Sequence, residues 1–172
     1  MFGDEGGAFD IVRQALRASL RMEEGWGRAT SLRSRLLEAT GAVSANDLLH
    51  RFYTVDWTRP KIASLARLVD EAAREGDAVA ADILAKEAQQ LAGFVAAVRR
   101  QLFRDAETAR VAWIGGVFRS GVVRERFTLL VELADGNRCG PPEMGPAAGA
   151  LLEAYRVAGV QVRLTNVPEM EK

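Results

Sequence analysis

The sequence predicts a helix-rich α/β fold with one small sheet, and three observations support this. First, apolar residues recur every three or four positions through most of residues 9–104, which is typical of amphipathic helices. Second, residues 111–114 form a short continuous apolar run, Val-Ala-Trp-Ile, which is typical of a strand buried on both faces. Third, Gly115 and Gly116 follow this run and a helical pattern resumes, so the strand leads directly into a helix.

Start and stop signals divide the first part of the chain into separate helices. Gly41 and Gly76 are placed to end helices, and Asp77 is placed to cap the next one. Pro60 disfavours helix at Arg59, so we expect a loop before the following helix. We interpret the apolar faces as the core. The predicted helices are residues 9–22, 30–40, 44–52, 61–75 and 77–104.

The second part of the chain shows fewer regular patterns. After the strand, residues 120–134 have a helical pattern, and residues 135–145 form a long connection rich in turn-forming residues. Pro146 suits the first turn of a helix that continues to Gly159. Apolar and polar residues alternate over 160–164, which predicts a half-exposed strand or a loose tail.

Composition excludes several classes of function. The 172 residues contain 23 basic and 23 acidic side chains, so the chain has no basic excess for general binding to nucleic acid or to an anionic membrane. Cys139 and His50 are the single residues of their types, which leaves no internal disulfide and no paired-histidine metal site. No run is long and apolar enough to span a membrane and no signal segment opens the chain, so we expect a cytoplasmic protein.

The two consecutive glycines at the end of the predicted strand are a candidate ligand site. A strand that ends in bare backbone before a helix start lets a ligand approach closely, and the helix start offers free N–H groups. The spacing of Gly115, Gly116 and Gly121 matches no standard phosphate loop. A tight turn that needs a positive φ explains the glycines equally well, and both interpretations stay open.

Two further stretches allow a structural and a functional interpretation. Asp4 and Glu5, in "GDEGG" before the first helix, suit either a helix cap or a pair of acceptors for ligand hydroxyl groups. Ala148 and Gly149 give the last predicted helix a first turn with little side-chain bulk. That turn suits either close packing or a second wall for a ligand held at Gly115 and Gly116.

In this order, the three stretches resemble the C-terminal half of the BadF/BadG/BcrA/BcrD-type ATPase family, which includes N-acetylglucosamine kinases. The resemblance covers residues 3–159 and is carried by "GDEGGAFDIVRQALRA", "VAWIGGVFRSGVVRERF" and "PAAGALLEA". It implies the C-terminal lobe of an actin-like, ribonuclease H-like ATPase with an incomplete sheet. Residues 1–159 would form the adenosine-binding lobe, and residues 160–172 a tail or edge strand.

The resemblance also implies ligands and residue roles. The cofactor would be ATP with Mg²⁺, and the phosphoryl acceptor an amino sugar reached by Asp4 and, less directly, by Glu5. Gly7 and Val12 depart from the family pattern, which usually has Ser and Gly there, and both departures bear on the acceptor. The nucleotide would lie between two groups of residues: Gly115, Gly116, Val117, Phe118 and Ser120 on one side, and Ala148 and Gly149 on the other.

The family's phosphate loops and catalytic aspartate have no counterpart in this sequence, and phosphoryl transfer needs such groups. We therefore assign no catalytic residue, and expect a truncated lobe that is inactive alone and either lacks its N-terminal lobe or forms a homodimer. An alternative hypothesis is a non-catalytic helical interaction module that dimerises through the exposed inter-lobe face. A third is a small helical regulator in which Gly115 and Gly116 only form a turn.

Overall fold

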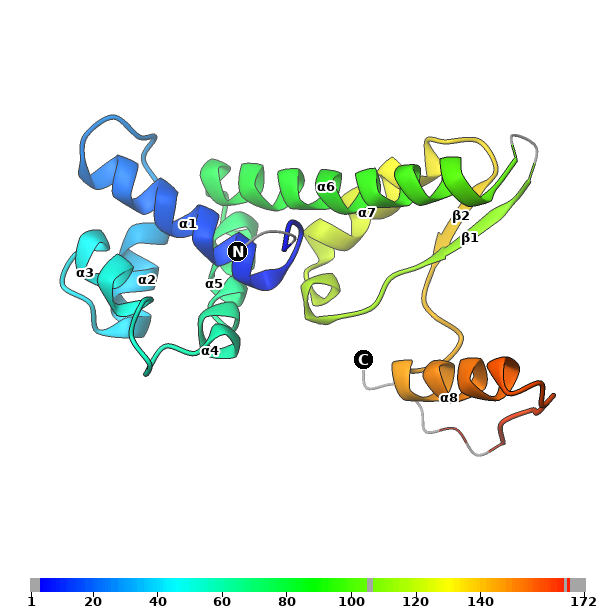
Figure 1. Ribbon diagram of the computed structural model, residues 1–172. Helices are drawn as coiled ribbons and strands as arrows, with labels where there is room; N and C mark the ends of the chain where they lie inside the picture. Colours follow the sequence, from blue (N-terminus) through cyan, green and yellow to red (C-terminus); the bar gives the residue numbers. More distant parts are fainter. Residues whose placement is uncertain (1–3, 105–106, 166, 168–172) are drawn as a thin grey trace.

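The computed structural model describes residues 4–104, 107–165 and 167, and has a helix-rich α/β fold with one small parallel sheet (Figure 1). The predicted fold class is confirmed at this level. Most of the chain before the sheet is helical. The elements in chain order are α1 (Ala8–Glu23), α2 (Leu32–Thr40), α3 (Ala45–Arg51), α4 (Arg59–Ala63), α5 (Ala66–Arg74), α6 (Ala78–Leu102), β1 (Ala109–Ala112), the 3₁₀ helix η1 (Gly116–Arg119), α7 (Gly121–Glu132), β2 (Asn137–Gly140) and α8 (Pro146–Val157).

The core lies where the first five helices and α7 meet α6. Figure 1 shows α1 to α5 gathered at one end of the molecule, with α6 extending from them toward the sheet. The apolar faces predicted from the sequence supply this core in the first five helices and in the first half of α6. The prediction is wrong for the second half of α6, where Phe94, Val98 and Leu102 are exposed because no element of the described chain covers that face. The fully buried large side chains include Val12, Leu32, Leu36, Leu48, Val69, Leu84 and Val123.

Local sequence signals account for several helix ends. Gly41 ends α2 in the left-handed conformation with φ 66°, which costs glycine little. Ser44 caps α3 by accepting a hydrogen bond from Asp47 N at 3.0 Å. Asp77 caps α6 as predicted, since its carboxylate accepts from the backbone N–H groups of Val79 and Ala80.

The single helix predicted for residues 61–75 is wrong, because the structure divides it into α4 and α5. Arg59 begins α4, and Pro60 lies in the first turn, where a missing N–H leaves no helical hydrogen bond unmade. The helix tightens at its end, where Leu65 N donates to Ile62 O at 3.0 Å, and α5 starts after this turn.

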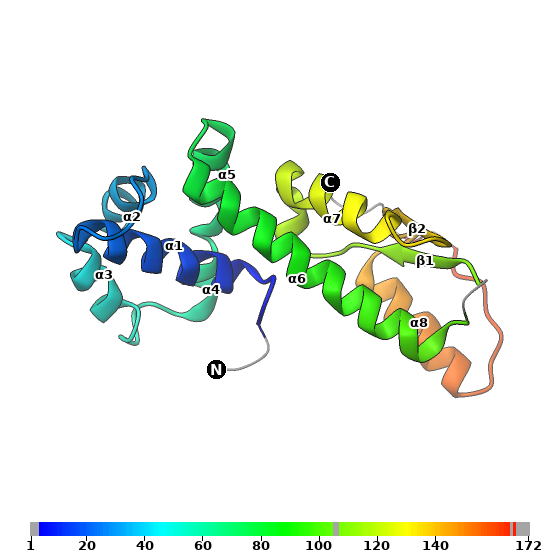
Figure 2. The same cartoon turned by 90° about the horizontal axis from the view of Figure 1, so that it is seen from above.

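The sheet has two parallel strands joined through η1 and α7. β1 pairs with β2 in the register Ala109 with Asn137 through Ala112 with Gly140. Figure 2 shows α7 running beside the second half of α6, so this pair of helices lies along the sheet. A parallel pair needs a crossover of this kind, and α7 supplies it.

The observed strands differ from the prediction in two ways. β1 covers residues 109–112 rather than 111–114, and its exposure alternates, with Ala109 buried and Arg110 exposed, so it is not buried on both faces. β2 lies inside the stretch predicted as a turn-rich connection. Its Asn-Arg-Cys-Gly sequence has no strand pattern, and its extended conformation comes from pairing with β1.

The last helix lies apart from the others. Figure 1 shows α8 below the strands, and α8 has no buried residue. The chain after it has no regular secondary structure over residues 160–165. Among the described residues, none of the helices has the length and apolar character needed to cross a lipid bilayer.

Candidate functional site

The junction between β1 and α7 leaves two glycines open to solution. Gly115 has φ 112°, a conformation that favours glycine, whereas Gly116 has no positive φ. A Cβ atom placed on either residue would meet no heavy atom within 4 Å. The turn explains Gly115, but neither packing nor backbone conformation explains Gly116. A ligand that packs directly against the main chain would need backbone that is exposed and carries no side chain, and Gly115 and Gly116 provide it.

The other predicted residues of this junction contact the protein itself. Val117 and Phe118 are half-buried, and the Phe118 ring packs edge-on against Phe127 with centroids 5.0 Å apart. Ser120 is buried and caps α7, since its Oγ accepts from Val123 N at 3.2 Å. Its hydroxyl group is therefore already engaged in holding the helix start.

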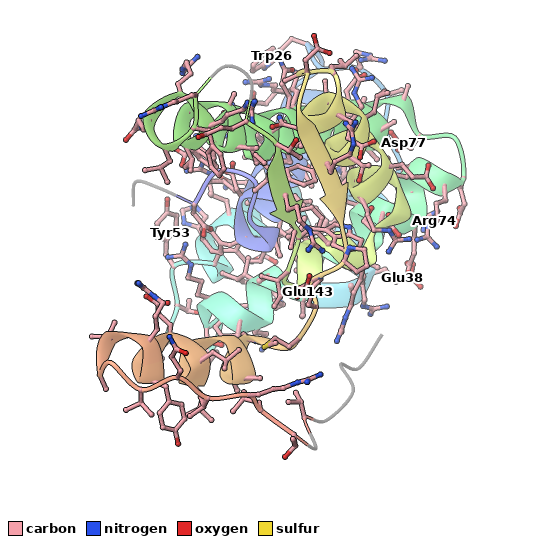
Figure 3. All side chains as sticks on the ribbon, turned by 90° about the vertical axis from the view of Figure 1, so that its right-hand side faces the viewer. Trp26, Glu38, Tyr53, Arg74, Asp77 and Glu143 are labelled. Atoms are coloured by element: carbon pink, nitrogen blue, oxygen red, sulfur yellow. The ribbon has the colours of Figure 1, made fainter. Side chains whose placement is uncertain are left out.

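The structure leaves Ala148 and Gly149 separate from this junction. Both residues lie near the start of α8 and are half-buried. A Cβ atom on Gly149 would meet nothing within 4 Å, as at Gly115 and Gly116. Figure 3 shows Glu143 between the strands and α8. Glu143 forms an ion pair with Arg110 of β1 at 2.7 Å.

A hollow of about 790 Å³ lies on the sheet. Its lining comes from both strands and from the connection that leads to α8. The residues that line it are Arg110, Val111, Ala112, Arg138, Cys139, Gly140, Pro141, Pro142, Glu143 and Met144.

The side chains of Asp4 and Glu5 lie in different environments. Asp4 Oδ2 forms an ion pair with Arg59 Nη2 of α4 at 2.8 Å. Glu5 is exposed and lines a cleft of about 470 Å³ between α1 and α6. Neither carboxylate caps α1. The N-cap residue is Gly7, and the start of the helix has no hydrogen bond from a capping side chain. The helix-cap interpretation therefore does not explain these two residues.

The same cleft contains two buried carboxyl groups that the sequence analysis missed. Asp10 and Glu87 are each only 3% exposed. Asp10 accepts a hydrogen bond from Arg13 Nε at 2.7 Å. A signal for Glu87 was present, because it lies four residues after Ile83 and four before Leu91 on the apolar face of its helix.

The residues that the structure describes contain no group of three or more His, Cys, Asp or Glu side chains placed to hold a metal ion. Within the described residues, Asp10 and Glu87 are therefore not part of a larger set of metal ligands. Arg13 Nε donates to Asp10, Gly6 N donates to Glu87 at 2.8 Å, and the two carboxyl groups are neighbours of each other.

Comparison with known proteins identifies the class to which this fold belongs. The sequence model of the BadF/BadG/BcrA/BcrD ATPase family matches residues 1–154, so the chain belongs to that family. This confirms the resemblance read from the three stretches.

One curated relative is similar to most of this chain. The N-acetylmuramic acid/N-acetylglucosamine kinase of Clostridium acetobutylicum is 32% identical to this chain over 120 residues. The matched part covers 70% of this chain and 39% of the length of that kinase.

Proposed function

We propose that this chain is the nucleotide-binding lobe of a BadF-type ATPase of the N-acetylglucosamine kinase-like kind. The observation that carries the proposal is the open backbone at Gly115 and Gly116, directly after β1 and before η1 and α7. A Cβ atom on Gly116 would meet nothing within 4 Å, so the backbone there is open to a ligand. Such bare backbone suits the nucleoside part of ATP, which can lie directly against it. Ala148 and Gly149 would form the opposite wall if α8 approaches the junction.

The proposal assigns only part of the reaction to this chain. Phosphoryl transfer needs phosphate cradles, carboxylates that hold Mg²⁺ and a group that orients the attacking hydroxyl. Neither the family's phosphate loops nor its catalytic aspartate has a counterpart in the sequence. We therefore propose that ATP with Mg²⁺ is turned over only together with these loops, and that this chain alone is inactive. A kinase assay of the chain with amino sugars tests this, and turnover would contradict it.

Substitution of Gly116 tests the nucleotide site itself. Gly116→Val adds a side chain where nothing lies within 4 Å, so we expect unchanged stability. ATP affinity, measured by calorimetry, should fall about tenfold or more, which corresponds to about 1.4 kcal/mol. Gly93→Ala is a matched control, because Gly93 is an exposed position of α6 that also has nothing within 4 Å. Equal ATP affinity in the two variants would reject the site.

The acceptor is proposed to be an amino sugar that contacts Asp4 and Glu5. Carboxylates accept hydrogen bonds from sugar hydroxyl groups, and the two side chains flank the start of α1. Asp4→Asn and Glu5→Gln keep the size of each side chain while removing its charge. A loss of amino-sugar binding with unchanged ATP binding supports the assignment, and unchanged amino-sugar binding in both variants contradicts it.

A second candidate function is a non-catalytic interaction module that forms a homodimer. One face of α6 carries Phe94, Val98 and Leu102, which are 50%, 50% and 72% exposed. Apolar side chains that recur every four residues form a continuous stripe, and an exposed stripe of this kind favours association. Val98→Asp should convert a dimer into a monomer in light scattering. A monomeric wild-type chain that binds ATP would reject this alternative.

A further inference from the structure

Glu87 is a buried acidic residue on the apolar face of α6, where packing alone would favour an apolar side chain. It lies in the middle of α6 and is 3% exposed. No Lys or Arg among the described residues forms an ion pair with it. Burying a carboxylate without a cation costs free energy, and an apolar residue would suit this position better. Glu87 therefore requires a role other than packing.

The carboxylate of Glu87 holds the segment before α1. Gly6 N donates a hydrogen bond to Glu87 Oε2 at 2.8 Å, across 81 positions of sequence. Leu91, one turn further along α6, leaves no room for a side chain at residue 6. A Cβ atom on Gly6 would lie 2.5 Å from Leu91 Cδ2. Gly6 also has φ 81°. Two successive turns of α6 therefore contact Gly6: Glu87 accepts a hydrogen bond from its amide, and Leu91 excludes a side chain.

The neighbours of Glu87 do not favour its charge. Burial raises the pKa of Glu87, the Gly6 hydrogen bond opposes this, and Asp10 raises the pKa further. The charged groups that face it from α1 are Asp10 and Arg13, and Arg13 is engaged with Asp10 at 2.7 Å. Lys86 is exposed beside it on α6, and Glu5 lines the same cleft. Burial and Asp10 therefore disfavour the charged form of Glu87, whereas the Gly6 hydrogen bond and the charge of Arg13 favour it.

We propose that Glu87 is a positioning residue for the acceptor segment, residues 4–7, because it fixes the Gly6 amide and so directs Asp4 and Glu5. The proposal rests on the proposed function, in which those two carboxylates contact the acceptor. Gly6 lies directly after them in the chain. Once its backbone is fixed, Asp4 is held toward Arg59 on one side and Glu5 toward the α1–α6 cleft on the other.

Amide exchange of Gly6 in the ¹⁵N-labelled full chain tests the contact. Glu87→Leu removes the acceptor, so we expect Gly6 to exchange about tenfold faster or more. Glu87→Gln keeps a weaker, neutral acceptor and should give an intermediate rate. Glu71→Gln, at an exposed position of α5, is the matched control and should leave the rate unchanged. A Gly6 rate in Glu87→Leu within about twofold of wild type, in a chain that still melts cooperatively, would overturn the proposal.

A pH titration provides a readout that a packing role would not change. In the wild-type chain the Gly6 amide proton should shift with the ionisation of Glu87, and the shift should vanish in Glu87→Gln. Asp10→Asn identifies any contribution from Asp10, and Glu5→Gln any from Glu5. This experiment decides the question even if Glu87→Leu does not fold, because a Gly6 signal that titrates identically in wild type and Glu87→Gln would overturn the proposal.

Ligand binding by the same samples separates this inference from the proposed function. Glu87→Gln should weaken amino-sugar binding and leave ATP binding unchanged, because Gly115 and Gly116 lie in a different part of the fold. If wild type binds no amino sugar, the acceptor assignment fails, and the role of Glu87 toward an acceptor fails with it. If wild type binds amino sugar and Glu87→Gln binds it equally well, only the positioning role is rejected.

Discussion

The hydroxyl group of Ser120 donates a hydrogen bond to Asp70 Oδ1 and so joins the start of α7 to α5. The same oxygen accepts from Val123 N at 3.2 Å, and Asp70 is in turn paired with Arg74 at 2.8 Å. Figure 3 shows Arg74 on the outer side of the helices. Ser120 is also one of the residues that the sequence assigns to the nucleotide, so its structural role has to be measured separately.

Ser120→Ala should destabilise the fold by about 1–2 kcal/mol, because it removes a helix cap and leaves buried polar groups without a partner. Ser120→Thr keeps the hydroxyl and should recover most of the loss. Urea unfolding measures both effects, and ATP titration of the two variants shows whether the hydroxyl also serves the ligand. A fully stable Ser120→Ala chain would contradict the structural role.

Asp77 joins the start of α6 to the segment before α2 through one carboxylate. It caps α6 through Val79 N at 2.9 Å and Ala80 N at 3.1 Å. It also accepts from Thr30 Oγ1 at 2.8 Å and from Ser31 N at 2.6 Å. Asp77→Ala removes both sets of bonds, so we expect a loss of about 2–4 kcal/mol in urea unfolding. Asp82→Ala, at an exposed position of α6, is the control and should cost much less.

The pH dependence of this site has a defined sign. Burial raises the pKa of Asp77, but the hydrogen bonds from Ala80, Thr30 and Ser31 outweigh it and lower the pKa from 3.8 to about 2. A pKa lowered by folding stabilises the fold above the unfolded value, and this contribution is lost as pH falls through the folded value. The stability difference between wild type and Asp77→Asn should therefore shrink between pH 3.8 and about 2. A constant difference over that range would refute this account.

Gly6 should not tolerate a side chain. Gly6→Ala places a Cβ atom 2.5 Å from Leu91 Cδ2 and keeps a φ of 81° that alanine rarely adopts. We expect a loss of about 1–3 kcal/mol. Adding Leu91→Ala removes the steric conflict but not the backbone strain, so the double variant should lose less than the sum of the two single losses. Strict additivity in thermal unfolding would show that the two residues do not interact.

The sequence was sufficient for the helices and for most of the core, because those features depend on local periodicity and on short-range caps. Ser44, Asp77 and Gly41 each act within a few residues of their own position. The division between α4 and α5 was not predictable in this way, since the apolar spacing continues across it and only a local tightening at Leu65 separates the helices.

The sheet and the candidate site depend on contacts between distant residues. β2 is extended because β1 pairs with it, and its own four residues carry no strand pattern. Glu87 meets Gly6 across 81 positions, and no local rule connects a mid-helix glutamate to a glycine near the start of the chain. The glycines at 115 and 116 were identifiable from sequence, but their openness to solution became visible only in the fold.

Cys139 should react slowly although its side chain is only half-buried. Burial raises the pKa of its thiol, the Thr128 hydroxyl lowers it through a bond of 3.8 Å, and Glu132 raises it again. The thiolate is the reactive form, so alkylation by iodoacetamide at neutral pH should be slower than in the urea-unfolded chain. Glu132→Gln removes the repelling charge but can still accept from Cys139 N, and it should speed the reaction modestly. The rate measured against pH should have its midpoint above the ordinary value of 9.0, and a midpoint below that value would show that the thiol is activated instead.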